Sequence, residues 1–358
     1  MSYARDNSGT TPVRAGFAFD VDALSRWMGA HIEGFAGPIE VTQFRGGQSN
    51  PTFKLTTRDR DYVLRRKPPG RLLKGAHAVD REARVMQALG REGFPVPQIL
   101  GLCEDETVIG SLFVIMTYVP GRIFWDPRLP EIESSRRAAY FDAMNATLAR
   151  LHQLDPVAAG LADFGNPGQY VARQIARWST QYVQDVEAGR DPHLDRLIEW
   201  LPSAVPSDDD ATAVIHGDFR CDNMIFHPEE PRIVAVLDWE LSTLGHPLAD
   251  FAYHALMYRL PEQVGAGLGG LDPRTYGLPR EADYVAAYCA RTGRDSVVHY
   301  EFYLAFNLFR LAAIFHGIKG RLVRGSAASA QAAERVAILP ELARLAWAQA
   351  VAAGAPPG

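Results

Sequence analysis

Apolar residues recur with a strand-like period in the first third of the chain and with a helix-like period beyond it. Short β-like runs, set between glycines and charged turns, predict strands. These strands are expected at Ile39–Phe44, Thr52–Thr56, Tyr62–Arg66 and Leu112–Tyr118. Apolar positions three and four residues apart predict helices at Val21–Ile32 and Val79–Leu89. The first third of the chain is therefore expected to be β-rich.

Most of the remaining chain has a helical pattern, interrupted by one β-like stretch over residues 213–237. Helices are expected at Arg136–His152, Tyr170–Val183 and Glu301–Ile318. Pro120 and Gly121 follow the last strand of the first part and mark the expected boundary. The sequence thus predicts an α+β fold of two lobes behind a polar, disordered leader. The expected divisions are 1–15 for the leader, 16–119 for a small β-rich lobe, and 120–358 for a larger, mainly helical lobe.

Three oxygen-bearing side chains lie in or beside the β-like stretch. If its two strands pair as a hairpin centred between residues 230 and 231, Asn223 falls opposite Asp238, where cross-strand neighbours are about 5 Å apart. A few hard oxygen ligands of this kind suit Mg²⁺ carrying nucleotide phosphates. Asp218, five residues before Asn223, can accept a proton from an acceptor hydroxyl. These three residues indicate phosphoryl transfer.

A simpler interpretation is that these residues form turns, where Asp and Asn are common. Asp222 fits that interpretation, and His216 with Gly217 shapes the turn before Asp218. The joint spacing of Asp218, Asn223 and Asp238 favours catalysis, because a turn does not require all three.

The pattern His216-Gly217-Asp218-x4-Asn223, followed by Asp238, resembles the catalytic core of the aminoglycoside phosphotransferase family, which has a protein-kinase-like fold. The resemblance implies ATP as co-substrate and Mg²⁺ as cofactor, with Asn223 and Asp238 as metal ligands and Asp218 as the catalytic residue. It also implies a nucleotide-binding first lobe and a second lobe that carries catalysis and binds the acceptor. Asp250 resembles the family's structural aspartate, which braces the catalytic loop; like His216, it is expected to support the site.

Arg65 and Glu82 are the strongest candidates in the first lobe. Glu82 lies within an apolar helix stripe, and burying a carboxylate there is costly unless it is paired. The resemblance implies that Arg65 pairs with Glu82 and binds the nucleotide phosphates. Many family members carry lysine at this strand position, whereas arginine keeps the charge and adds a planar fork. The alternative is that Glu82 lies at the rim of the stripe and pairs with a surface arginine.

Four further residues are expected at the nucleotide. Glycine between two strands lets backbone N–H groups approach an anion, so Gly47 and Ser49 are expected over the phosphates, although a plain hairpin turn would have the same sequence. Backbone groups near Met116 and Tyr118 are expected at the adenine, and core packing would produce the same apolar run.

Two charged residues are left with alternatives. Glu240 could bind a second metal ion, contact the acceptor, or be a solvated carboxylate. Arg310 lies inside an apolar helix and needs a partner. It is expected to form an internal ion pair, for example with Asp250, and its alternative role is contact with an anionic acceptor.

Charge and cysteine content restrict the partners. The chain has 37 basic and 42 acidic residues, a net charge of −5, so no overall positive field favours nucleic acid or an anionic membrane. Three scattered cysteines argue against a disulfide framework, and neither a signal peptide nor a run of roughly 20 apolar residues is evident. A cytoplasmic protein with a small-molecule substrate is expected; the sequence leaves its oligomeric state open.

Within the family, two segments resemble the kinase-like domain fused to acyl-CoA dehydrogenases. They are Arg65-Arg-Lys-Pro-Pro-Gly70 and Asn307–Ile314. By analogy, a hydroxyacyl thioester or hydroxy acid is expected as acceptor ahead of an aminoglycoside. The alternative is a nucleotide-binding regulatory module without catalysis, which has no need of Asp218. A protein kinase is disfavoured because little room for an activation segment separates Asp238 from Asp250.

Overall fold

The computed structural model describes residues 8–46, 50–68, 78–264, 267–325 and 330–357. The chain divides into two compact units. Unit 1 comprises Met1–Trp125, Ala159–Leu161 and Arg220–Ser242, and unit 2 comprises Asp126–Ala158, Ala162–Phe219 and Thr243–Gly358. The boundary expected after residue 119 lies close to the first of these divisions. The hairpin expected in the helical lobe, however, belongs to unit 1.

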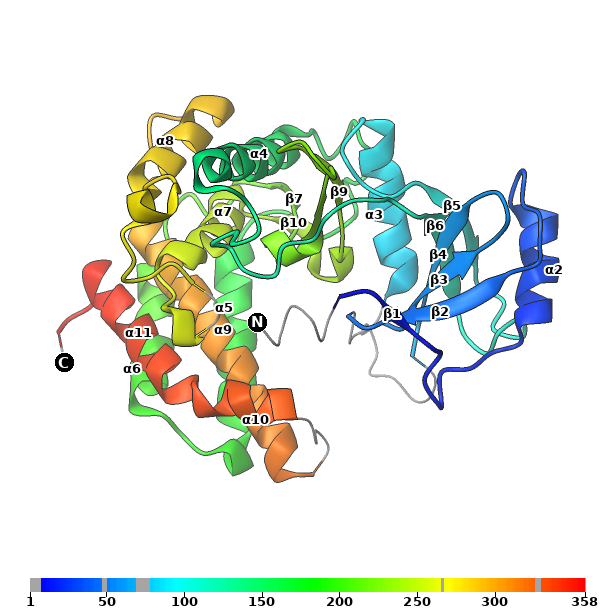
Figure 1. Cartoon of the computed structure of the whole chain (residues 1–358). Coiled ribbons are helices and arrows are strands. Elements are labelled where there is room, and N and C mark those ends of the chain that lie inside the picture. Colours follow the sequence, from blue (N-terminus) through cyan, green and yellow to red (C-terminus); the bar gives the residue numbers. More distant parts are fainter. Residues whose placement is uncertain (1–7, 47–49, 69–77, 265–266, 326–329, 358) are drawn as a thin grey trace. The chain divides into compact units, whose positions relative to one another are not determined.

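Unit 1 contains a six-stranded antiparallel sheet in the order β1-β2-β3-β4-β6-β5 (Figure 1). Its strands are β1 (Thr10–Thr11), β2 (Glu40–Phe44), β3 (Thr52–Thr56), β4 (Asp61–Arg66), β5 (Ile99–Cys103) and β6 (Phe113–Thr117). Four of them correspond to predicted strands. Strand β5 was not predicted, because Gly101 interrupts its short apolar run and Pro97 precedes it.

The expected disordered leader is partly wrong. Thr10 and Thr11 form β1 and pair with Phe44 and Gln43 of β2, so the sheet begins within residues 1–15. Residues 1–7 lie outside the described part of the chain.

Helices α2 (Val21–His31) and α3 (Val79–Arg91) lie on opposite faces of this sheet (Figure 1). The side chain of Asp20 caps α2 by accepting a hydrogen bond from the backbone N–H of Ala23 at 2.9 Å. One face of the sheet and α2 form a single apolar core. Its members include Leu24, Met28, Phe53, Leu55, Tyr62, Leu64, Phe113 and Ile115. Because side chains alternate along a strand, Arg65 lies on the other face, which α3 covers.

The hairpin of unit 1 is formed by β8 (Met224–Phe226) and β9 (Ile233–Val236). Met224 pairs with Val236, so Asn223 lies opposite Leu237, whose N–H donates to the Asn223 carbonyl at 2.8 Å. The predicted pairing of Asn223 with Asp238 is therefore wrong by one residue. Asp238 follows the strand with a left-handed backbone conformation, at φ 63° and ψ 58°. Its side chain therefore leaves the backbone in a different direction from that of a strand residue.

Unit 2 is mainly helical. Its α-helices are α4 (Ser134–Gln153), α5 (Tyr170–Gln184), α6 (Pro192–Ala204), α7 (Pro247–Ala255), α8 (Glu281–Thr292), α9 (Tyr300–Val323), α10 (Ala330–Ala337) and α11 (Leu339–Ala352). The long helix α9 packs against α5, α7, α10 and α11. Strands β7 (Ala213–Ile215) and β10 (Thr243–Gly245) form a small antiparallel pair, and the loop after β7 carries Asp218.

Among the helices that the structure describes, none is both long and apolar enough to cross a membrane. Cys103, Cys221 and Cys289 all lie in described segments, where each is buried and none forms a disulfide.

Candidate active site

Arg65 lies at the centre of a polar cluster in unit 1. Its Nε is 2.9 Å from a Glu82 carboxylate oxygen, and its Nη2 is 2.6 Å from Oδ1 of Asp238. Glu82 comes from α3, where only 2% of the residue is exposed, and Asp238 comes from the end of the hairpin. The predicted ion pair between Arg65 and Glu82 is therefore confirmed, and Glu82 does not lie at a rim.

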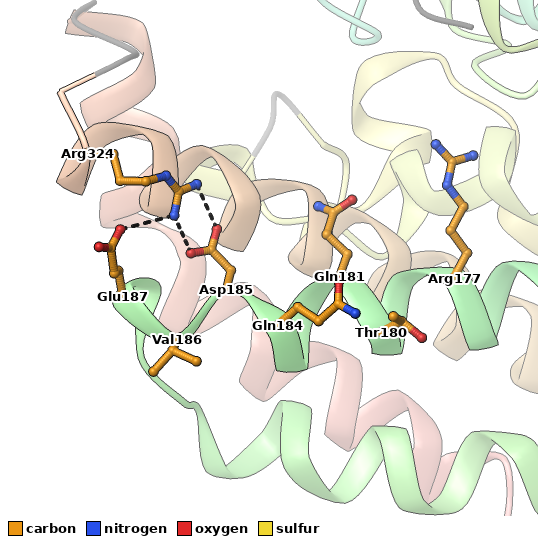
Figure 2. A pocket seen from close by; sticks show the side chains of 8 residues that line it. All are labelled: Arg177, Thr180, Gln181, Gln184, Asp185, Val186, Glu187 and Arg324. Carbon is orange, nitrogen blue, oxygen red and sulfur yellow. Dashed lines mark hydrogen bonds and ion pairs between the residues drawn. The ribbon is translucent and has the colours of Figure 1, made fainter. Parts of the chain in front are cut away.

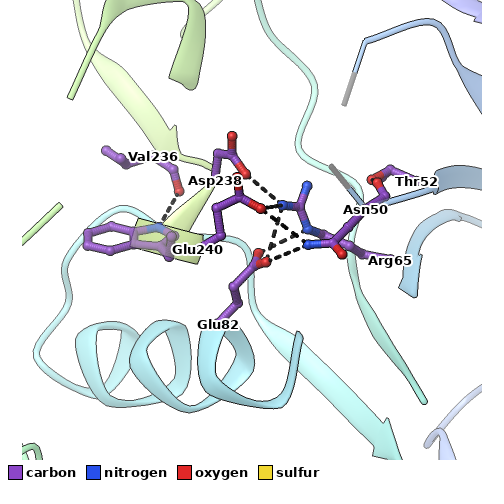
Figure 3. Close-up of polar contacts among 8 residues, drawn as sticks. Asn50, Thr52, Arg65, Glu82, Val236, Asp238 and Glu240 are labelled. Atoms are coloured by element: carbon purple, nitrogen blue, oxygen red, sulfur yellow. Dashed lines mark hydrogen bonds and ion pairs between the residues drawn. The ribbon is translucent and has the colours of Figure 1, made fainter. Parts of the chain in front are cut away.

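Asn50 and Glu240 complete this cluster (Figure 3). The Asn50 side-chain amide is fully buried and donates to Glu82 at 3.1 Å and to Glu240 at 3.4 Å. Glu240 also lies 3.9 Å from the Arg65 guanidinium. Sequence reasoning missed Asn50 because it follows a glycine turn and no pattern reveals a contact with α3. Glu240 has two polar contacts, so it is not merely a solvated carboxylate.

Three carboxylates and an arginine meet in this cluster. Glu82, Asp238 and Glu240 surround one cation, Arg65. Burial raises the pKa of Glu82 to about 7, against the attraction of Arg65. Burial lowers the pKa of Arg65, but the carboxylates around it outweigh this effect, so that pKa lies above its ordinary value. The carboxylates around Arg65 thus hold its guanidinium in place and keep it charged.

The two expected metal ligands, Asn223 and Asp238, both lie at this end of the hairpin. Asp238 keeps 32% of its side chain exposed, and Asn223 is joined to the neighbouring Leu237 by a backbone hydrogen bond. Nowhere in the described segments do three or more His, Cys, Asp or Glu side chains form a group able to hold a metal. Mg²⁺ usually takes only one or two protein carboxylates together with substrate phosphates, so one carboxylate and one amide oxygen suit it.

In unit 2, Asp250 holds the loop that carries Asp218. Its carboxylate accepts hydrogen bonds from the backbone N–H groups of His216 and Gly217, each at 2.9 Å. Gly217 has φ +83°, a conformation that side chains rarely adopt. The backbone N–H of Asp218 donates to His216 Nδ1 at 3.2 Å. These contacts agree with the supporting places predicted for His216 and Asp250.

Two residues that the sequence did not single out for this site also belong to it. His152 Nε2 lies 3.1 Å from Asp250, and its Nδ1 lies 2.7 Å from the Tyr288 hydroxyl. Burial raises the pKa of Asp250, but the hydrogen bond and charge of His152 outweigh burial, so that pKa lies below its usual value. The Tyr253 hydroxyl donates to Oδ1 of Asp218. Both contacts join residues at least 35 positions apart, which no local pattern reveals.

Arg310 does not form the expected ion pair with Asp250. Its Nη2 donates to the carbonyl oxygen of Gly217 at 2.9 Å, and its guanidinium lies over the Tyr253 ring. Arg310 is 6% exposed, which disfavours direct contact with an acceptor. A backbone carbonyl and an aromatic face are its partners instead, and Asp250 accepts hydrogen bonds from His152 and from the backbone N–H groups of His216 and Gly217.

The remaining predicted nucleotide contacts, those of Gly47, Ser49, Met116 and Tyr118, are not tested by the structure. Gly47 and Ser49 lie outside the described residues. Met116 is buried in β6, and the Tyr118 ring lies 4.7 Å from the Lys54 ammonium. The contact of their backbone with adenine stays a prediction.

A groove of about 560 Å³ lies elsewhere in unit 2, at the C-terminal end of α5 (Figure 2). Its charges are largely paired with each other, because Arg324 binds Asp185 at 2.6 Å and Glu187 at 3.3 Å. None of the predicted site residues lines it.

Known proteins resemble most of this chain. Mouse acyl-CoA dehydrogenase family member 10 is 45% identical over 344 residues, which are 94% of this chain and 32% of that protein. The Arabidopsis thaliana protein named probable acyl-CoA dehydrogenase IBR3 is 40% identical over 347 residues, which cover 92% of this chain and 42% of that protein. The chain thus spans less than half the length of these curated relatives.

A solved structure from Ralstonia eutropha, provisionally described as an aminoglycoside phosphotransferase, is 47% identical. Its TM-score is 0.86, and the match covers 94% of this chain and 99% of that one. The profile of the phosphotransferase enzyme family matches residues 40–286, more than half of the chain. The chain therefore has a mixed α+β, protein-kinase-like fold and belongs to the phosphotransferase enzyme family.

Proposed function

We propose that the protein transfers the terminal phosphate of ATP to a hydroxyl group of a small molecule, with Mg²⁺ as cofactor. The observation that carries this proposal is the place of Arg65, at 2.9 Å from Glu82 and 2.6 Å from Asp238. A cation fixed between a helix carboxylate and a hairpin carboxylate offers a donor for phosphate oxygens beside a ligand for a metal ion. Membership of the phosphotransferase family supports the same class of reaction.

Each residue has one role in the proposed reaction. Arg65, oriented by Glu82, binds phosphate oxygens of the nucleotide. Asn223 and Asp238 are the side chains that hold Mg²⁺, which supplies neutralisation of the phosphate charge. Asp218 accepts the proton of the acceptor hydroxyl. Because Asp218 and Asn223 are five residues apart, the covalent chain keeps their Cα atoms within roughly 18 Å.

We propose a hydroxyacyl thioester or a hydroxy acid as acceptor, ahead of an aminoglycoside. This choice is supported by the 45% identity to a protein named as an acyl-CoA dehydrogenase family member. The adenine contacts of the backbone near Met116 and Tyr118 and a cytoplasmic location belong to the same proposal.

The test is a steady-state assay with Mg²⁺ and ATP against hydroxyacyl-CoAs, hydroxy acids and aminoglycosides, with phosphorylated products identified by mass spectrometry. We expect a phosphorylated hydroxyacyl or hydroxy-acid product. Turnover of aminoglycosides alone would overturn the proposed acceptor class but not the phosphotransferase activity.

A thermal-shift measurement accompanies this assay. ATP with Mg²⁺ at a hundred times its Kd should stabilise the folded protein by about 2.7 kcal/mol. Stabilisation without any phosphorylated product from a broad metabolite pool would favour the regulatory module. No stabilisation and no product would contradict both functions.

A further inference from the structure

One face of helix α7 holds the loop of residues 216–219 at successive points. Asp250 accepts hydrogen bonds from the backbone N–H groups at positions 216 and 217. His254 Nδ1 lies 2.8 Å from the carbonyl oxygen of Phe219. Residues three and four positions apart share a helix face, so Tyr253 lies on the same face as Asp250 and next to His254. The loop backbone is therefore fixed on both sides of Asp218.

Tyr253 contacts the side chain that this backbone carries. Its hydroxyl donates a hydrogen bond to Oδ1 of Asp218. The Arg310 guanidinium carbon lies 5.2 Å from the centroid of the Tyr253 ring, and the same group donates to the carbonyl oxygen of Gly217. A buried cation over an aromatic face holds that ring in place. The phenol hydroxyl thus has a defined position relative to the loop.

A fixed backbone does not by itself orient the Asp218 carboxylate. The terminal torsion of an aspartate is broad, because rotation about a bond between tetrahedral and planar carbon has no sharp minima. The hydrogen bonds described above from Asp250, His254 and Arg310 to the loop all involve its backbone atoms. A hydrogen bond to the carboxylate is the contact that acts on this torsion, and Tyr253 supplies one.

We propose that Tyr253 is a positioning residue that sets the rotation of the Asp218 carboxylate for proton transfer. This inference rests on the proposed function, which makes Asp218 the base. During transfer, the acceptor O–H proton passes to an Asp218 carboxylate oxygen. The acceptor oxygen bonds to the γ-phosphorus, and the bond from that phosphorus to the β,γ-bridging oxygen breaks, with its electron pair leaving on ADP.

The test compares Tyr253→Phe, Asp218→Asn and the double variant, using Mg²⁺ and ATP with water or a hydroxy acid as the acceptor probe. Tyr253→Phe removes only the hydroxyl and keeps the ring beneath Arg310. We expect kcat for ADP formation to fall about 10-fold, because orientation of the base is lost, with KM for ATP within about twofold. In the Asp218→Asn background, the same change should cause no further loss of kcat. The Tm loss of the double variant should be smaller than the sum of the single losses.

The matched control is Tyr182→Phe, because Tyr182 donates the same kind of hydrogen bond to Asp195 at 2.7 Å. This variant should lower Tm and leave kcat unchanged. An unchanged kcat in Tyr253→Phe, a further loss in the Asp218→Asn background, or additive Tm losses would each overturn the inference. A wild-type protein that forms no ADP while the Tm losses remain non-additive would contradict the proposed function and leave the contact itself established.

Discussion

At the residue scale, the candidate site depends on how a few charges are balanced. Arg65 lies within reach of three carboxylates, those of Glu82, Asp238 and Glu240. The Asn50 amide donates hydrogen bonds to two of the three carboxylates and so stabilises part of their negative charge. Removing Arg65 takes this counter-charge from the buried Glu82 carboxylate, which costs more free energy than losing an exposed ion pair.

We therefore expect Arg65→Ala to lower the free energy of unfolding by about 3 kcal/mol or more. The matched control is Arg232→Ala, because Arg232 pairs with Glu230 at 3.1 Å while more than half of each side chain is exposed. That change should cost less than about 1 kcal/mol. Urea unfolding followed by circular dichroism measures both. Equal losses would show that the Arg65 cluster behaves as a surface ion pair.

The two aspartates of the proposed site, Asp218 and Asp238, should differ in the effects of their replacement. Asp218→Ala removes the proposed base, so we expect kcat to fall on the order of 10²-fold or more while nucleotide affinity stays nearly intact. Asp238→Ala removes a proposed metal ligand and should abolish binding of ATP with Mg²⁺. Isothermal titration calorimetry and steady-state kinetics distinguish the two. Full turnover in both variants would show that the site is wrongly assigned.

At the element scale, the hairpin β8–β9 decides where Asp238 lies. Phe226 pairs with Ile233 but Ile225 pairs with Ala235, so the register shifts by one residue between them, and Asn223 comes to lie opposite Leu237. A one-residue slip normally reverses which face a side chain occupies. Here the left-handed backbone at Asp238 compensates by directing its carboxylate to Arg65. The sequence showed the two strands and their turn, but not an irregularity that depends on packing.

Gly121 fixes this hairpin to the chain that leaves β6. Arg122 and Phe226 exchange two backbone hydrogen bonds of 2.8 Å, and a Cβ on Gly121 would lie 2.3 Å from the Phe226 carbonyl oxygen. We expect Gly121→Ala to lower the free energy of unfolding by about 2 kcal/mol or more and to weaken binding of ATP with Mg²⁺.

The matched control for Gly121→Ala is Gly29→Ala, within α2. A Cβ there would meet its nearest atom at 4.0 Å, and replacing helical glycine by alanine gains up to about 1 kcal/mol. Differential scanning calorimetry should give a lower Tm for the first variant and an equal or higher Tm for the second. A Gly121→Ala variant as stable as the wild type would contradict the close approach.

At the scale of the whole molecule, unfolding should respond to acid through buried histidines. Burial lowers the pKa of His254 from 6.5 to about 4, although the hydrogen bond with the Phe219 carbonyl acts in the opposite direction. Between these values the unfolded chain binds a proton that the folded chain does not. The stability contributed by this group is thus complete above pH 6.5 and is lost as pH falls towards 4.

The wild type should therefore lose about 2 kcal/mol of stability between pH 7 and pH 5 through His254. His246, whose pKa burial also lowers, adds to the loss in the same direction. His254→Gln can still donate to the carbonyl but does not titrate, so its stability difference between the two pH values should be smaller by that amount. Urea unfolding at both pH values measures it. An equal pH response in both proteins would show that His254 does not titrate as described.

The sequence by itself determined the elements with a clear hydrophobic period, and it predicted the pairing of Arg65 with Glu82. Periodicity sets which face of an element is buried, and a buried carboxylate requires a partner; the family resemblance implied that this partner is Arg65. Tertiary structure alone decided the register at Asp238, the amide of Asn50 beside Glu82, and the contact of Tyr253 with Asp218. These contacts join residues distant in the chain, and only the packing of whole helices and strands fixes which side chains meet.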